Sequence, residues 1–159
     1  MRLFYPILAV ALLVIAAGAL TLWRGDKILG HADSKDAEQV ARGRLVYNEN
    51  CASCHGSGLQ GEPDWRERKP DGRLPAPPHD DTGHTWHHPD EHLFQITKLG
   101  VKPPLAPEGY ESDMPSFSEK LSDEDIWAAL SFIKSRWSEK SRAYQERIDQ
   151  AYRKNAQEQ

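Results

Sequence analysis

The sequence predicts an all-α fold, because apolar residues recur at helical spacing in three separate segments and no segment alternates in the manner of a strand. A single long apolar segment precedes these three at the N-terminus. Hydrophobic residues make up 38% of the 159 residues and charged residues 28%. This composition fits one globular domain with appendages, rather than a polytopic membrane protein or a disordered chain. With a net charge of −4, the chain lacks the strongly basic character that is typical of nucleic-acid-binding proteins.

The N-terminal segment, residues 3–23, contains no charged side chain. At about 1.5 Å of rise per residue, a helix of this length crosses a hydrocarbon core of ~30 Å. Arg2 and the terminal amine make a positive flank that favours the cytoplasmic side. A cleaved signal peptide is the alternative, because residues 17–19 have the small-x-small form of a cleavage site. The apolar run continues to Trp23 and so favours a retained anchor; either interpretation places the remainder outside the cytoplasmic membrane.

The first two helices of the soluble part are predicted from their caps and apolar stripes. One begins after Ser34 or Asp36 and carries an apolar stripe that includes Val40, Gly43, Val46 and Tyr47. The other runs over 89–99, with Pro89 as its first residue, acidic residues in its first turn and Gly100 as its terminator.

The last helix of the expected core begins at Ser122, a good N-cap residue with Asp125 three positions later. Ile126, Leu130 and Ile133 then repeat at helical spacing. Residues 138–159 contain no Pro or Gly and also predict a helix. Its aromatic and apolar residues lie near one face, so it either extends the preceding helix, packs back on the domain, docks a partner or remains a solvated tail.

The decisive motif is Cys51-Ala52-Ser53-Cys54-His55, the C-x-x-C-H attachment signature of a c-type haem. Two thiols one helical turn apart can add to the two vinyl groups of a porphyrin. The adjacent His55 then supplies one axial nitrogen to the iron. A thioredoxin-like pair would need a βαβ setting, and a zinc site would need a second ligand pair, but the chain has only two cysteines.

Apart from the initiator, Met114 is the only methionine, and it lies in a loop rich in proline and glycine. A rigid loop of this kind can hold a weak thioether ligand against iron. A lone methionine is more often a core gap filler, but Met114 precedes Pro115 in a polar loop. We therefore expect His55 and Met114 to be the two metal ligands. An iron with both axial positions filled suits electron transfer and argues against catalysis at the metal.

On these residues, the chain resembles the class I cytochrome c family, specifically a small membrane-anchored bacterial member with one haem. The resemblance covers about 35–137, from a first helix leading into Cys-x-x-Cys-His-Gly to the Met114-Pro115 pair and a closing helix. It implies an all-α domain around one covalently bound haem c, with the first and last helices crossing at right angles. It also implies that Gly43 and Tyr47 meet the turn 129–132. A loop proline, Pro77 by preference, would accept a hydrogen bond from the second nitrogen of His55.

Five of the seven histidines cluster between His79 and His92, among several aspartates. One interpretation is a second metal site for copper or zinc. The simpler one is that Trp86 and Thr85 or a neighbouring histidine donate to the haem propionates while other histidines face water. His84 or His88 in place of Met114 as the iron ligand is a further possibility.

The sequence thus predicts four parts: an anchor or signal segment (1–24), a linker (25–34), the haem domain (35–137) and a helical extension (138–159). The expected function is electron transfer between redox proteins at the bacterial inner membrane, with the haem domain on the periplasmic side. We expect an electron carrier rather than an enzyme, with no small-molecule substrate and no nucleic acid. The alternatives are a haem subunit of a membrane redox enzyme complex, and a haem or metal sensor or copper chaperone built on the histidine cluster.

Overall fold

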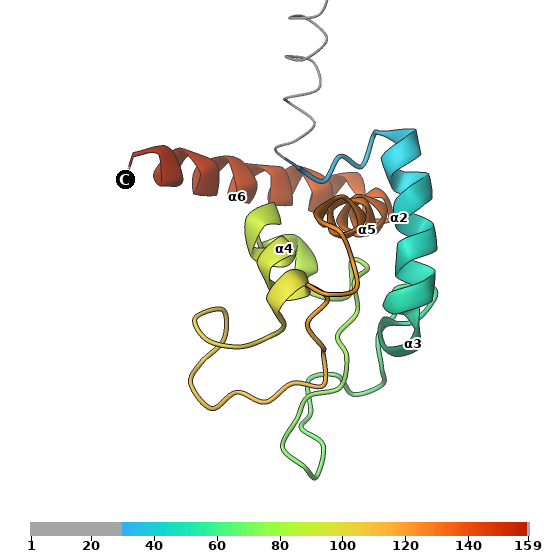
Figure 1. The fold of residues 1–159 in the computed structure, drawn as a ribbon, viewed down its shortest axis with the longest axis vertical. Coiled ribbons are helices and arrows are strands. Elements are labelled where there is room, and N and C mark those ends of the chain that lie inside the picture. Colours follow the sequence, from blue (N-terminus) through green and yellow to red (C-terminus); the bar gives the residue numbers. More distant parts are fainter. Residues whose placement is uncertain (1–29, 159) are drawn as a thin grey trace, which may run out of the picture. The chain divides into compact units, whose positions relative to one another are not determined.

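The computed structural model describes residues 30–158, and that part of the chain contains only helices and loops (Figure 1). The chain forms two compact units, Met1–His31 and Ala32–Gln159, and all the described elements belong to the second. In chain order they are α2 (Ala37–Asn50), α3 (Ala52–His55), the 3-10 turn η1 (Thr85–His87), α4 (Asp90–Leu99), α5 (Asp123–Ser135) and α6 (Glu139–Gln157). The all-α expectation is therefore confirmed for the described residues.

The expected membrane segment, residues 3–23, lies outside the described residues. Within 30–158, no helix is both long enough and apolar enough to cross a membrane. The expected limits of the linker and of the haem domain stay predictions.

The crossing of α2 and α5 is built on one glycine. In Figure 1, α5 is seen almost end-on beside the upright α2, so the two helices cross steeply. A Cβ atom at Gly43 would lie 1.8 Å from the carbonyl oxygen of Ala128 and 3.0 Å from the Cβ of Phe132. Only glycine allows this approach. The fully buried Tyr47 fills the crossing, with its ring 5.4 Å from that of Phe132, so the expected packing is confirmed.

The helix ends follow the expected caps with one correction. Asp36 caps α2, accepting from the backbone N–H groups of Glu38 and Gln39, and Ser122 caps α5 through the N–H of Asp125. Pro89 was expected as the first residue of its helix, but it occupies the N-cap position of α4 and makes no side-chain cap. A proline has no side-chain acceptor, and the backbone N–H of Asp90 is capped instead by a residue from α6, as described below.

Helix α6 packs back on the domain as a separate helix rather than extending α5. Ser138 caps α6, and its backbone N–H donates to the Asp81 carboxylate at 2.9 Å. The neighbouring Trp137 is buried, and its Nε1–H donates to the carbonyl of His79 at 2.7 Å. These contacts fix the break between the helices, and α6 then lies against η1.

The buried face of α6 is polar, which the sequence pattern did not indicate. Its buried residues are Ser141, Gln145 and Asp149, whereas Tyr152 is 44% exposed. The Asp149 carboxylate accepts from the backbone N–H of Asp90 at 2.9 Å, and Gln145 Nε2 donates to the Asp90 carboxylate at 2.7 Å. Asp149 thereby supplies the cap that Pro89 cannot give to α4.

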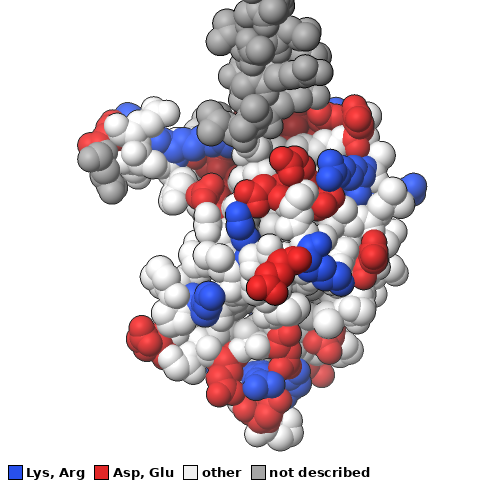
Figure 2. All heavy atoms as spheres, viewed as in Figure 1, with Lys and Arg blue, Asp and Glu red and all other residues white. Residues whose placement is uncertain are grey.

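Asp90 is also the centre of an ion pair between α4 and α5. Both of its carboxylate oxygens lie 2.7 Å from Lys134 Nζ, and its side chain is only 3% exposed. Burial raises the pKa of Asp90 and the charge of Lys134 opposes that rise. The two helices share a second pair, Lys98–Asp123, which is also 2.7 Å long but lies at the surface. Acidic and basic side chains are interspersed in the same way over the face drawn in Figure 2.

We predict that Lys134→Gln lowers the free energy of unfolding by about 3 kcal/mol at neutral pH, because it leaves the buried Asp90 charge without a cation. The matched control is Lys98→Gln, which removes an exposed pair between the same helices and should cost less than about 1 kcal/mol. Denaturant unfolding of the full chain measures both. Equal losses for the two variants would show that burial of the Asp90 pair has no special weight.

Candidate haem-binding site

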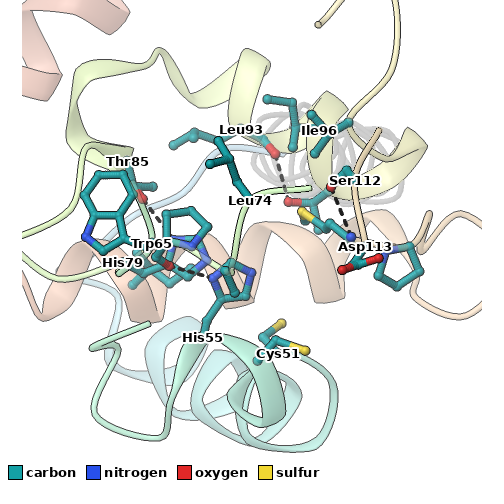
Figure 3. A pocket seen from close by; sticks show the side chains of 18 of the residues that line it. Cys51, His55, Trp65, Leu74, His79, Thr85, Leu93, Ile96, Ser112 and Asp113 are labelled. Atoms are coloured by element: carbon teal, nitrogen blue, oxygen red, sulfur yellow. Dashed lines mark hydrogen bonds between the residues drawn. The ribbon is translucent and has the colours of Figure 1, made fainter. Parts of the chain in front are cut away.

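A cavity of about 340 Å³ lies between the motif and the downstream loops. All four expected site residues line it: Cys51, Cys54, His55 and Met114. Apolar side chains from α4 and α5, among them Leu93 and Ile133, form much of the remaining wall. Figure 3 shows Ser112 and Asp113, which precede Met114, on a different wall from Cys51 and His55. The residues that sequence reasoning selected are therefore brought together from segments far apart in the chain.

The two thiols are placed by the junction of α2 and α3. Cys51 is the C-cap of α2, and the N–H groups of Cys54 and His55 donate to its carbonyl at 3.2 and 2.9 Å. One helical turn therefore separates two free cysteines, one half-buried and one exposed. Burial raises the pKa of the Cys51 thiol to about 11 against the lowering effect of Lys120. The turn ends at Gly56, whose φ of +80° favours glycine and explains the Gly after the motif.

His55 is held in one orientation by the proline-rich loop. Its Nδ1 lies 2.8 Å from the Pro77 carbonyl oxygen, which confirms the expected partner. A carbonyl only accepts, so Nδ1 carries the proton and Nε2 keeps its lone pair for the cavity that His55 lines. Burial lowers the pKa of His55 more than its bond to Pro77 raises it, and this keeps the imidazole neutral. A neutral, oriented imidazole is the form that binds a metal.

The Pro77 loop is positioned by residues that the sequence analysis did not single out. The N–H of Gly61 donates to the His55 carbonyl, and the N–H of Glu62 donates to the Ala76 carbonyl. A Cβ atom at Gly61 would lie 2.5 Å from the backbone nitrogen of Pro78. The loop therefore packs directly on the Gly61 backbone. The only sequence feature that could have indicated this contact is a glycine shortly after the motif. Pro77 and Pro78, on which it packs, lie about sixteen residues further along the chain, and no local pattern links the two segments.

Met114 reaches the cavity from a loop fixed on both sides. Its backbone N–H donates to Ser112 Oγ at 3.1 Å. The adjacent Asp113 carboxylate binds Lys69 at 2.6 Å and Arg73 at 2.7 Å. The hydrogen bond from Lys69, with that from Arg73, holds the pKa of Asp113 below its usual value.

The histidine cluster divides between the cavity and its surroundings. His79, His84 and His88 line the cavity together with Thr85. The centroid of the half-buried His79 ring lies 4.0 Å from that of His55, and His79 Nδ1 is 2.9 Å from Thr85 Oγ1. Burial lowers the pKa of His79 well below its ordinary value and that of His88 to about 4. These histidines are neutral near neutral pH.

The structure does not support a second metal site in the histidine cluster. Within residues 30–158, no group of three or more His, Cys, Asp or Glu side chains is arranged to hold a metal ion. The rings instead stack: His84 lies against Trp65 and His88 against His92. Trp86, expected at the haem edge, stacks on His87, and its buried Nε1–H has no hydrogen-bond partner among the described residues. Of that expected pair, Thr85 is the residue that lines the cavity.

The donor set fits a c-type haem. Two thiols a turn apart, a neutral imidazole and a thioether in one largely apolar cavity are the groups that attach a porphyrin and fill both axial positions of its iron. The comparisons with known proteins agree. A sequence model of the family described as cytochrome c oxidase, cbb3-type, subunit III matches residues 38–133, which include all four residues. The chain belongs to this family. It is therefore a class I c-type cytochrome, and membership of this family implies a haem c cofactor.

Three curated relatives are similar to parts of the chain. FixP, a cbb3-type cytochrome c oxidase subunit from Sinorhizobium medicae, is 27% identical over 96 residues, which cover 60% of this chain and 29% of that protein. CcoP from Azospirillum, also described as a cbb3-type cytochrome c oxidase subunit, is 62% identical over 26 residues, or 16% of this chain and 9% of that protein. Cytochrome c-555 from Prosthecochloris aestuarii is 44% identical over 45 residues, or 23% of this chain and 46% of that protein.

The chain thus spans less than half the length of each of these relatives. No solved structure matches it.

We predict that Gly61→Ala lowers the free energy of unfolding by about 2 kcal/mol more than Gly72→Ala does, because only the first places a methyl group against packed backbone. Both glycines have positive φ, 68° and 86°, but a Cβ at Gly72 would meet nothing within 4 Å. The matched pair separates loop contact from backbone strain. Equal destabilisation in denaturant unfolding would contradict the positioning role given to Gly61.

Proposed function

We propose that this chain is a membrane-tethered electron carrier that exchanges single electrons through one haem bound covalently by Cys51 and Cys54. The observation that supports this most directly is that a single cavity is lined by both thiols, His55 and Met114. When bound, the haem supplies a one-electron iron couple. The protein supplies the thiols that attach the haem, the two axial ligands of the iron and a largely apolar cavity wall.

His55 and Met114 are proposed as the two axial ligands. The Pro77 carbonyl holds the Nδ1 proton, so His55 presents Nε2 as a ligand atom. The thioether of Met114 favours the reduced iron and raises the reduction potential. With both positions filled by side chains, the site offers no coordination position for a substrate, and this favours a carrier over a catalyst.

The location of the carrier follows from the N-terminal segment. Residues 3–23 are proposed to span the inner membrane, with the haem domain (35–137) on the periplasmic side. Tethering raises the effective concentration of the haem domain near membrane-bound redox proteins, which we propose as its partners. No chemistry in this role requires a small-molecule substrate.

A second candidate is a haem subunit of a membrane oxidase complex. The matched family and two of the relatives are named as subunits of cbb3-type cytochrome c oxidase, which is the observation that favours this role. The two candidates differ in assembly. A permanent subunit would copurify with a larger membrane complex in mild detergent, whereas a carrier would migrate alone.

We predict that the oxidised full-length protein shows the weak long-wavelength absorption band of iron–thioether ligation, and that Met114→Ala abolishes it. The variant should also bind carbon monoxide when reduced, because its sixth position is open. The matched controls are His84→Ala and His88→Ala, which remove other side chains from the same cavity and should keep the band. A parent without the band, or a band lost in a histidine variant and kept in Met114→Ala, would overturn the ligand assignment.

A further inference from the structure

We propose that Asp113 is a positioning residue for Met114, acting through an ion cluster of Asp113, Lys69 and Arg73 that we call the Asp113 clamp. The inference rests on the proposed function, because it concerns how the axial thioether is kept at the iron. Asp113 itself is assigned no contact with the haem. It acts on the ligand that follows it in the chain.

The clamp engages both oxygens of one carboxylate. Lys69 Nζ lies 2.6 Å from Asp113 Oδ2, and Arg73 Nη1 lies 2.7 Å from Oδ1. Arg73 Nε also approaches Glu111 at 3.5 Å. Isolated surface ion pairs contribute little to stability, but a cluster in which one carboxylate bridges two cations is the favourable case. The side chains of Asp113, Lys69 and Arg73 are 46%, 36% and 40% exposed, so salt can reach the clamp.

Lys69 and Arg73 lie on one turn of the loop that also carries Pro77. The N–H of Lys69 donates to the Arg73 carbonyl and the N–H of Gly72 donates back to the Lys69 carbonyl, both at 2.8 Å. The Asp71 carboxylate accepts from the backbone N–H of Arg73 at 3.0 Å. These hydrogen bonds within the turn set the spacing of the two positive charges independently of Asp113.

The clamp supplies most of the ion pairs and hydrogen bonds that link the loop before Met114 to the rest of the described chain. Its backbone hydrogen bonds among described residues are internal: Leu105 and Ala106 donate to Lys102, and Tyr110 donates to Pro107. Its ion pairs with the rest of the described chain are those of Asp113 and Glu111, and the Arg68 guanidinium lies 6.0 Å from the Tyr110 ring centre.

The other side of Met114 is anchored independently. The N–H of Phe117 donates to the Thr97 carbonyl, and Ser116 Oγ donates to the Lys98 carbonyl, so this side is tied to the end of α4. Loss of the clamp therefore frees one side of the ligand and leaves the other in place. A thioether is a weak ligand, so we expect it to leave the iron more often when its loop is held at one end only.

The clamp also connects the two loops that serve the iron. Arg73 and Pro77 belong to the same loop, and the Pro77 carbonyl orients His55. Asp113 and Met114 belong to the other loop. The bridge between Arg73 and Asp113 thus links the segment that orients one ligand to the segment that carries the other.

The test measures how fast cyanide binds to the oxidised, haem-loaded full-length protein, a reaction limited by departure of Met114. Asp113→Asn should raise the rate about fivefold, the factor given by loss of an ion cluster. The double variant Lys69→Gln/Arg73→Gln should do the same, and Asp113→Glu should retain most of the parental rate. The matched control, Arg42→Gln, removes a 2.8 Å pair with Asp125 between α2 and α5 and should leave the rate unchanged.

Salt provides a readout that needs no substitution. Raising the ionic strength should increase the cyanide rate of the parent and leave that of Asp113→Asn unchanged, because the clamp is already absent there. Equal rates in parent and Asp113→Asn, or equal salt dependence in both, would overturn the clamp. A parent that lacks the iron–thioether band would instead refute the proposed ligation, so the two failures are distinguishable.

Discussion

The structure depends on the contact between the Gly43 backbone and α5. Because Gly43 has no side chain, α2 lies directly against the Ala128 carbonyl of α5. The fully buried Tyr47 then packs where the two helices cross. The hydroxyl of Tyr47 then donates to the Gly56 carbonyl at 3.1 Å, directly after the attachment motif. The helix crossing therefore sets where α3, and with it His55, lies relative to α5 and the cavity wall.

Helices α4 and α6 and the connecting loops keep the cavity wall in position. Asp90 joins α4, α5 and α6 through Lys134, Gln145 and Asp149, and this network keeps the wall of α4 in place. The loops that carry Pro77 and Met114 are held by backbone hydrogen bonds, by the ion pairs of Asp113 and by the packing of Pro78 on Gly61.

Much of the fold and site could be predicted from local sequence. Caps at Asp36 and Ser122 and the apolar stripes predicted the helices, and the motif of Cys51, Cys54 and His55 pointed to the family that the comparison found. The resemblance to class I cytochromes c supplied Pro77. Contacts between distant polar residues could not be predicted, because Asp149 capping α4 and Asp113 bridging two loops leave no periodic signal. For α6, the aromatic stripe predicted the contact of Tyr144 no better than a docking face, and it did not indicate that Ser141, Gln145 and Asp149 would be the buried residues.

The proposed electron transfer requires one haem bound covalently through both thiols of the motif. The most direct measurement is the mass of the full-length protein after export, with the mass of the peptide that contains Cys51 and Cys54. We predict an increase equal to one haem, carried by that peptide and lost when both cysteines are replaced by serine. A peptide without added mass, or haem that is extracted under denaturing conditions, would contradict covalent attachment at this site.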